Sequence, residues 1–236
     1  MIIMSTTNWP QAQNLPPGEP QSAPLLVKKT AEFAIVGDGK NANWSRTEWV
    51  SIPQRKTFGD SFETRVKVLY SETGLYFLFH CQDQKLTASM EADFLDLWNE
   101  DVVEVFLWPD ENFPAYFEYE LSPLNYELPL LVPNNKGDFL GWLPWHYQGD
   151  RKILHATSVE GGEKKSGAEI SAWIAEFFIP YKLLKPLGNL PPVSGTRWRA
   201  NLYRCDYDRG QMAYWAWQPI EVRFHEYERF GTLLFE

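Results

Sequence analysis

An indole followed closely by a carboxylate is the part of this sequence best suited to recognising a ligand. Trp98 and Glu104 lie in the run LWNEDVVEVF, residues 97–106. The flat apolar face of an indole stacks on the C–H face of a sugar ring, and a nearby carboxylate accepts hydrogen bonds from its hydroxyls. Trp98 and Glu104 are therefore candidate sugar-binding residues. The alternative is a loop that leads into a half-buried strand, with Trp98 packed and the acids solvated.

A second aromatic group lies in the run AYWAWQP, residues 213–219. Trp215 and Trp217 are separated by one residue, so on a strand both face the same way and Tyr214 faces the other way. Both rings could be core. Because Trp217 precedes Gln218-Pro219 at a strand end, we expect it to project beside the loop as a second sugar-stacking ring, with Trp215 as a weaker candidate.

A sheet must position these side chains, and the pattern of apolar residues predicts one. Short alternating or apolar runs punctuated by Gly, Pro, Asn and Asp indicate strands, and only residues 93–98 and 180–187 look helical. The fold class expected is all-β, an antiparallel β-sandwich of jelly-roll or immunoglobulin-like type with one or two short helices. The clearest predicted strands are residues 64–70, 75–82, 101–108, 116–121, 169–179, 198–207 and 230–235.

Period-two alternation assigns the polar side chains of three strands to one face. Glu104 opposes an apolar face in residues 101–108, and Glu118 and Glu120 share the polar face of the next strand. We expect these acids to be solvated on the outer face of a sheet, where they suit a ligand rich in hydroxyl groups. The predicted hydrogen-bonding residues are Glu104, Asn201, Glu118 and Arg204.

Length and composition limit the classes of function. The 236 residues, 44% of them hydrophobic, are enough for one well-filled domain. The formal net charge of −9 disfavours partners made of nucleic acid or anionic membrane. The chain contains 11 tryptophans, more than a core of this size needs, so some are expected to be presented to a ligand.

The organisation along the chain predicts one domain with an N-terminal arm. Residues 1–24 are rich in Pro, Gln and Ser and are expected to form an extended arm, and residues 25–236 form the β-sandwich domain. The start has no signal-peptide pattern. The localisation stays open between cytoplasmic and, if the start is processed, extracytoplasmic, and the sequence leaves the oligomeric state open.

Cysteines and acidic loops offer few metal sites. Cys81 and Cys205 lie in apolar runs, which favours two buried thiols over one disulfide, and no C-x₂-C spacing suggests zinc. Loop residues Asp38, Asp60 and Asp83 are weak Ca²⁺ candidates, since Ca²⁺ prefers oxygen ligands. No cofactor is required by these patterns, and Ca²⁺ is possible.

The order of motifs resembles the family 9 carbohydrate-binding modules over nearly everything after the arm. The resemblance is carried by VGDG at residues 36–39, GLYF at 74–77, the W-x-x-D-x-x-E-x-F block from Trp98, IPY at 179–181 and the C-terminal FG at 230–231. It implies a β-sandwich that holds the end of a glycan between two tryptophans, with structural Ca²⁺ in some members. By position, Trp98 and Trp217 match the two rings, Glu104 a sugar-contacting carboxylate and Asn201 an amide.

Three departures from the family pattern concern the site. Glu118 stands where characterised modules have an arginine, so the resemblance does not extend to recognition of a reducing end. Gln218-Pro219 replaces Ser-Asp-Pro after Trp217. The insertion at residues 125–148 contains Trp142 and Trp145 and could cover or extend the site.

The expected function is non-catalytic binding of an oligo- or polysaccharide, in polysaccharide recognition or catabolism. One alternative is a glycosidase that uses Glu104 with Glu118 or Glu120 as its carboxylate pair. Two others are a haem-binding domain and a scaffold with a vestigial pocket. The haem ligands would be Met90 with His155 or His225.

Overall fold

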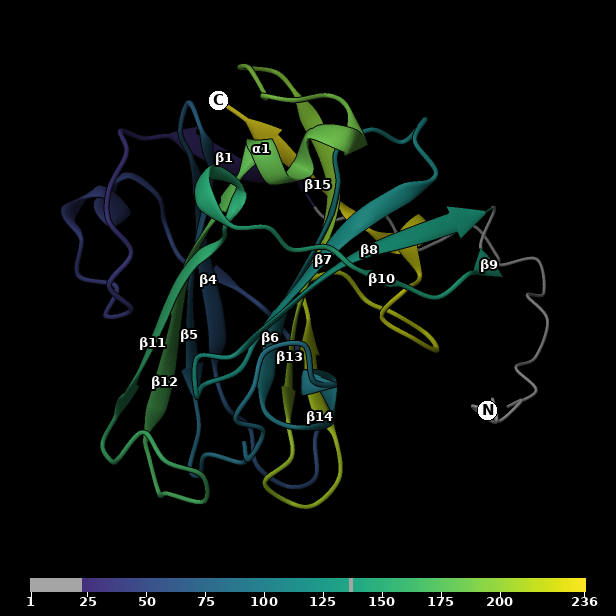
Figure 1. The fold of residues 1–236 in the computed structure, drawn as a ribbon. Helices are drawn as coiled ribbons and strands as arrows, with labels where there is room; N and C mark the ends of the chain where they lie inside the picture. Colours follow the sequence, from purple (N-terminus) through teal and green to yellow (C-terminus); the bar gives the residue numbers. More distant parts are fainter. Residues whose placement is uncertain (1–22, 136–137) are drawn as a thin grey trace.

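The computed structural model describes residues 23–135 and 138–236 as a protein built mainly of strands (Figure 1). One short helix, α1 (Tyr181–Leu184), lies among them, and single 3₁₀ turns include Leu97–Asn99 and Tyr227–Arg229. The strands are β1 (Leu25–Lys29), β2 (Val50–Ser51), β3 (Gln54–Lys56), β4 (Thr64–Tyr70), β5 (Gly74–Gln82), β6 (Val102–Trp108), β7 (Ala115–Leu121), β8 (Glu127–Asn135), β9 (Asp138–Phe139), β10 (Leu143–Pro144), β11 (Leu154–Glu160), β12 (Ala172–Pro180), β13 (Arg197–Asp206), β14 (Ala213–Ala216) and β15 (Gly231–Phe235).

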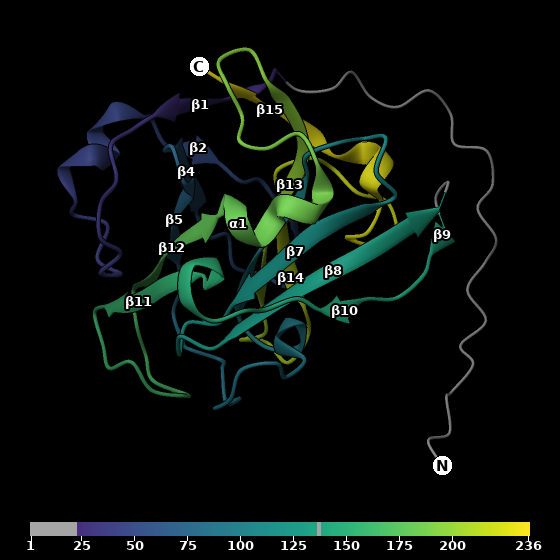
Figure 2. The same ribbon diagram turned by 45° about the horizontal axis from the view of Figure 1, so that its top comes forward.

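The strands form two facing layers, which confirms the predicted β-sandwich. One layer runs β10-β8-β7-β6-β13-β15, with β14 beside β13, and the other runs β4-β5-β12-β11. In Figure 1 the second layer stands on the left and β6, β13 and β14 stand to its right. Figure 2 shows β8, with β10 beside it, at the outer margin of the first layer.

Strand β1 departs from the expected antiparallel arrangement. Leu25, Leu26 and Val27 pair in parallel with β15, and Lys28 and Lys29 pair in parallel with β4. The sheet is therefore mixed, and one strand belongs to both layers.

The predicted apolar faces meet between the layers. Val103, Val105 and Leu107 of β6 are fully buried there, together with Trp173 of β12 and Trp198 of β13. The alternation read from the sequence therefore assigns the inner face of these strands correctly.

The outer face of the first layer is covered rather than solvated, which corrects the sequence-based expectation. Glu104, Glu118 and Glu120 are only 2%, 4% and 0% exposed. A second cluster of apolar side chains packs over this face, from β6, β7 and β8 and from segments that include Tyr227 and Phe230. The alternation predicted the direction of the glutamates correctly, but loops distant in sequence exclude solvent from them.

Two further predictions have clear outcomes. The helical region begins at Tyr181, as the pattern after Pro180 predicted, and Cys81 and Cys205 are free and buried. Residues 1–22 of the predicted arm lie outside the described residues. Within the described part of the chain, no helix has the length and apolar character needed to cross a bilayer.

Candidate functional site

A cavity of about 390 Å³ opens on the covered outer face of the first layer. Its lining combines three glutamates with aromatic and apolar side chains from β6, β7, β13, β14 and the connecting segments. The lining residues are Trp98, Glu104, Phe106, Glu118, Glu120, Leu130, Trp142, Cys205, Tyr207, Met212, Tyr214, Ile220, Val222, Arg223, Phe224 and His225.

The three glutamates come together because β6 and β7 are antiparallel neighbours. Glu104 and Glu120 are direct cross-strand partners, and Glu118 is opposite Phe106 on the same face. The Cys205 thiol lies 3.7 Å from a Glu104 oxygen. Among the described residues, no donor reaches Glu118 Oε2 or the two carboxyl oxygens of Glu120 except the hydrogen bond that these two carboxyl groups can share, so polar capacity is left for a ligand.

Burial favours the neutral form of these acids. It raises the pKa of Glu118 to about 8, and burial together with the neighbouring Glu118 charge raises the pKa of Glu104 well above its usual range. The pKa of Glu120 is raised in the same way, by burial first and then by Glu104 and Glu118. Near neutral pH the group therefore carries fewer than three negative charges and can both donate and accept hydrogen bonds.

Aromatic rings form the walls of the cavity. The Trp98 and Trp142 rings meet edge to face, with centroids 5.2 Å apart and planes at 72°. The Tyr207 hydroxyl donates to the Trp98 carbonyl oxygen at 2.8 Å and so fixes the turn that carries the indole. Phe224, which contacts Tyr214 with centroids 5.5 Å apart, lines the cavity from the segment after β14.

His225 belongs to the same wall. Its ring stacks on Phe139, with centroids 4.4 Å apart, and its Nδ1 is 2.7 Å from the Tyr116 hydroxyl. Burial, with the nearby Arg223, lowers the pKa of His225 to about 4. The imidazole is therefore neutral at physiological pH although Nδ1 lies 3.8 Å from Glu118 Oε2.

The structure does not bring Trp217 to Trp98 as the sequence suggested. Trp217 is 8% exposed and packs with Trp215 in the core between the layers, while Tyr214 faces the cavity. The prediction that both tryptophans share a face is confirmed, but that face is the inner one. The Trp217 ring lies against Gly231, where no side chain occupies the space.

Asn201 and Arg204 are likewise directed at other protein groups. Asn201 Oδ1 accepts from the backbone N–H of Gln218 at 2.9 Å, and its amide nitrogen donates to the Tyr203 hydroxyl at 2.7 Å. Arg204 points between the layers, where its Nη2 lies 3.0 Å from Asp83 and 2.8 Å from Asp206. Neither residue lines the cavity, because alternation along β13 places Arg204 on the inner face and Asn201 is held by the segment after β14.

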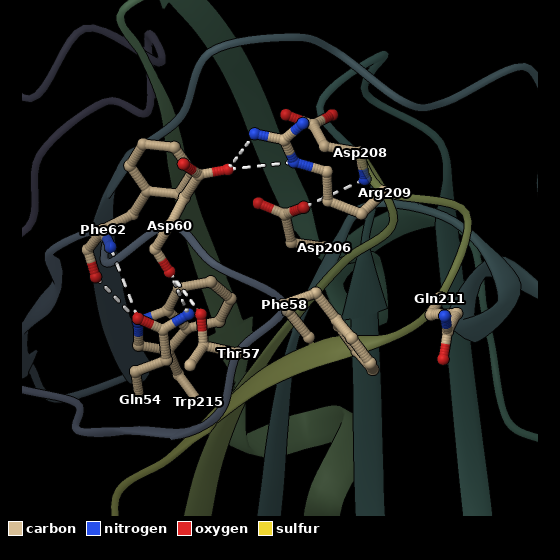
Figure 3. Close-up of a pocket in the computed structure, with 11 residues that line it drawn as sticks. Gln54, Thr57, Phe58, Asp60, Phe62, Asp206, Asp208, Arg209, Gln211 and Trp215 are labelled. Atoms are coloured by element: carbon tan, nitrogen blue, oxygen red, sulfur yellow. Dashed lines mark hydrogen bonds and ion pairs between the residues drawn. The ribbon is translucent and has the colours of Figure 1, made fainter.

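The three calcium candidates do not come together. The side chain of Asp38 accepts from the Lys40 backbone N–H, and Asp60 accepts from Arg209 Nη2 at 2.6 Å, as Figure 3 shows. Asp83 does join an acidic group with Asp206 and Asp208, whose oxygens lie within 4.8 Å of one another.

The Arg204 guanidinium lies against two members of that group, Asp83 and Asp206, and already supplies a positive charge. A Ca²⁺ ion needs six to eight oxygen ligands that are free to coordinate it. These residues therefore do not fit a calcium ion while the arginine remains in place.

The haem alternative gains no support from the placement of its residues. His225 lines the cavity, but Met90 is not among the described residues that form its wall. His155 lies on β11 of the other layer, where its Nδ1 is 3.1 Å from Asn125 Oδ1.

Several cavity residues were not predicted from the sequence. Trp142 was noted only as part of an insertion, and Tyr214 only as the reverse of the Trp215 face. Phe224 and His225 come from an irregular segment after β14 that has no periodic signal. Their common property is an aromatic side chain in a loop, which the sequence alone does not assign to a particular sheet face.

Comparisons with known proteins agree with the architecture. The family profile described as carbohydrate family 9 binding domain-like matches residues 35–235. A search of curated proteins gave no match. A Bacteroides uniformis protein to which carbohydrate binding is attributed is similar in structure, with a TM-score of 0.72 and 17% identity over 90% of this chain and 98% of that one.

Two similar structures are family 9 carbohydrate-binding modules from Caldicellulosiruptor kristjanssonii. One, in complex with glucose, has a TM-score of 0.64 and 15% identity over 91% of this chain and 96% of its own. The other, in complex with cellotriose, has a TM-score of 0.63 and 14% identity over 91% of this chain and 94% of its own. At these identities the similarity shows the fold.

Proposed function

The chain belongs to the carbohydrate family 9 binding domain-like family. From this premise we propose that it binds a sugar, without transforming it, in the cavity whose floor is formed by Glu104, Glu118 and Glu120. The observation that carries the proposal is the combination of indole walls and buried carboxyl groups in one cavity of about 390 Å³. Pockets that bind small ligands are typically apolar, with a few polar groups that fix orientation. A role in recognising polysaccharide follows from this binding.

The two indoles at the cavity serve as stacking surfaces for a pyranose ring. Trp98 is fixed by its turn, and Trp142 is 42% exposed and reaches the cavity from the segment between β9 and β10. Glu104, Glu118 and Glu120 then offer hydrogen bonds to the ring hydroxyls. The glucose and cellotriose bound by the similar modules support glucose-type sugars as first ligands to test.

The same carboxyl groups are poorly arranged for hydrolysis. A retaining glycosidase needs one carboxylate that stays ionised and one acid whose pKa is raised. Here burial raises the pKa of all three glutamates, which leaves no group specialised as the ionised partner. We therefore expect no release of aryl alcohol from a panel of aryl glycosides, and measurable release would contradict the non-catalytic proposal.

Replacing Trp98 by alanine is expected to weaken sugar binding at least about 10-fold, or about 1.4 kcal/mol, because a stacking surface is lost. Isothermal titration with cellotriose measures the effect. The wild-type affinity should be micromolar or weaker, which corresponds to roughly −8 kcal/mol or less in magnitude.

Trp217→Phe is the matched control, because it alters an indole in the core rather than in the cavity. It should lower stability while binding changes by less than about twofold. If Trp98→Ala binds cellotriose as the wild type does, the cavity is not the sugar site.

A further inference from the structure

We propose that the preferred ligand of this cavity is a saccharide with a free amino group, such as an oligomer of glucosamine. The inference rests on the proposed sugar-binding function and adds a substrate class to it. It follows from two features of Glu104, Glu118 and Glu120 at the floor of the cavity: among the described residues no lysine or arginine lies at ion-pair distance from them, and several of their buried oxygens lack a donor.

The three glutamates have no cationic partner at ion-pair distance among the described residues. The only basic side chain within 4 Å of them in that part of the chain is His225, which burial keeps neutral near pH 7. Arg204 extends from the inner face of β13 and pairs with Asp83 and Asp206 instead. A buried carboxyl group either stays protonated or ionises beside a partner of opposite charge, and here a cationic ligand can supply that partner.

The free oxygens suit an ammonium group in particular. In the described part of the chain, no donor reaches either oxygen of the fully buried Glu120 or Oε2 of Glu118, apart from the hydrogen bond that the two carboxyl groups can share. An ammonium has three N–H donors and no acceptor, whereas a hydroxyl satisfies one acceptor for each hydrogen. One amino group can therefore hydrogen-bond oxygens from both glutamates at once.

The walls favour the same chemistry. Indole and phenol rings attract a cation that lies near their faces. Trp98, Trp142 and Tyr214 line the cavity around the glutamates. Aromatic walls and an acidic floor together form a typical ammonium-binding environment, and a neutral sugar uses only the stacking part of it.

The titratable groups around the three glutamates determine how ligand binding depends on pH. Among the described residues, the other titratable groups near the glutamates are Asp96 before β6, Tyr116 from β7, Tyr203 and Cys205 from β13, Tyr207 after it, Tyr214 from β14, and Arg223 and His225 from the segment after β14. Arg223 is directed toward the Phe139 ring, 5.7 Å from its centroid. Because the glutamates hold protons near neutral pH, an incoming ammonium should displace at least part of a proton.

A bridging metal ion is the less favoured explanation for the acids. Among the described residues, the only group of three or more His, Cys, Asp or Glu side chains whose ligand atoms all lie within 4.8 Å of one another is Asp83, Asp206 and Asp208, which is not part of this cavity. The test therefore includes a chelator.

The experiment is calorimetric titration of the whole chain with three trisaccharides: the glucosamine trimer, its N-acetylated form and cellotriose. At about pH 6.5 the glucosamine trimer should bind at least 10-fold more tightly than the other two and should release protons, seen as a heat that varies with the ionisation enthalpy of the buffer. EDTA should leave this preference unchanged. The preference for the glucosamine trimer can be measured on the wild-type protein alone.

Variants then assign the preference to the floor. Glu118→Gln and Glu120→Gln should reduce the ratio of the two affinities toward one. Glu163→Gln, on the exposed loop between β11 and β12, is the matched control and should keep the ratio. A fold check by circular dichroism accompanies each variant.

The outcomes separate the two proposals. Equal or weaker binding of the glucosamine trimer than of cellotriose overturns the amino-sugar inference and leaves sugar binding intact. Equal binding of the N-acetylated trimer, or loss of the preference in EDTA, also overturns it. If none of the trisaccharides binds, both the inference and the proposed function fail.

Discussion

Raising the pH from about 6.5 to about 8.5 is expected to destabilise the protein, because ionising the cavity glutamates costs the folded state free energy. Burial raises the pKa of Glu118 from its ordinary value of 4.5 to about 8 and raises the pKa values of Glu104 and Glu120 well above their usual range. Over this pH range the folded state binds more protons than the unfolded state. Stability therefore falls as pH rises.

The expected loss is about 2 kcal/mol from Glu118 alone, with further loss from its two neighbours. Asp83, whose pKa burial raises to about 7, acts in the same direction. The window ends near pH 6.5 because buried His155 and His225 have lowered pKa values and oppose the trend below it. Urea unfolding at several pH values measures the slope.

Glu118→Gln provides the control for this slope. The variant keeps the shape of the side chain and removes one titrating group, so it should be more stable than the wild type at about pH 8.5 and should show a weaker pH dependence. A wild-type protein whose stability is flat or rises over the same range would mean that the glutamates are ionised at little cost, and the described burial would be wrong.

Replacing Arg204 by methionine is expected to lower the free energy of unfolding by about 3–5 kcal/mol near pH 8. The guanidinium is fully buried and pairs with Asp83 and Asp206, and it lies over the Trp215 ring at 4.3 Å from the centroid. Methionine fills much of the volume but leaves two acids without their cation. For a chain of this length the melting temperature should fall by about 10 °C.

Two comparisons test the cause of this loss. Near pH 5.5 the loss should be smaller, because burial raises the pKa of Asp83 and of Asp206 and their protonation removes the unpaired charge. Arg209→Met removes a surface partner of Asp60 and should cost less than about 1 kcal/mol. Equal losses for the two arginine variants would contradict the role assigned to Arg204.

Local pattern was enough to predict most of the sandwich. Alternation defined the faces of β6 and β7, and the observed bounds of β4, β6 and β7 differ from the prediction by at most one residue. Strand β8 was missed because Pro129 and Pro133 interrupt its pattern, although both residues pair with β7. Prolines are tolerated at a sheet margin, where only one side of a strand needs a full ladder.

The site was harder to predict, because alternation assigns a side chain to a face of a sheet but does not show which loops cover that face. Trp98 and the three glutamates were found, since they lie on or next to strands with clear alternation. The assignment of Trp217 was wrong in geometry because a position near a strand end does not decide whether a ring turns into the core. His225 and Trp142 reach the cavity through loop paths that local pattern does not encode.

The sharing of β1 between the two layers has a consequence for how the protein comes apart. Leu25, Leu26 and Val27 pair with one layer and Lys28 and Lys29 pair with the other, so the layers cannot separate without breaking the pairing at one end of this five-residue strand. Strand β1 therefore links the two layers through backbone pairing. In native-state hydrogen exchange, the amides of β15 and β4 should therefore open in one cooperative event, although they belong to opposite layers.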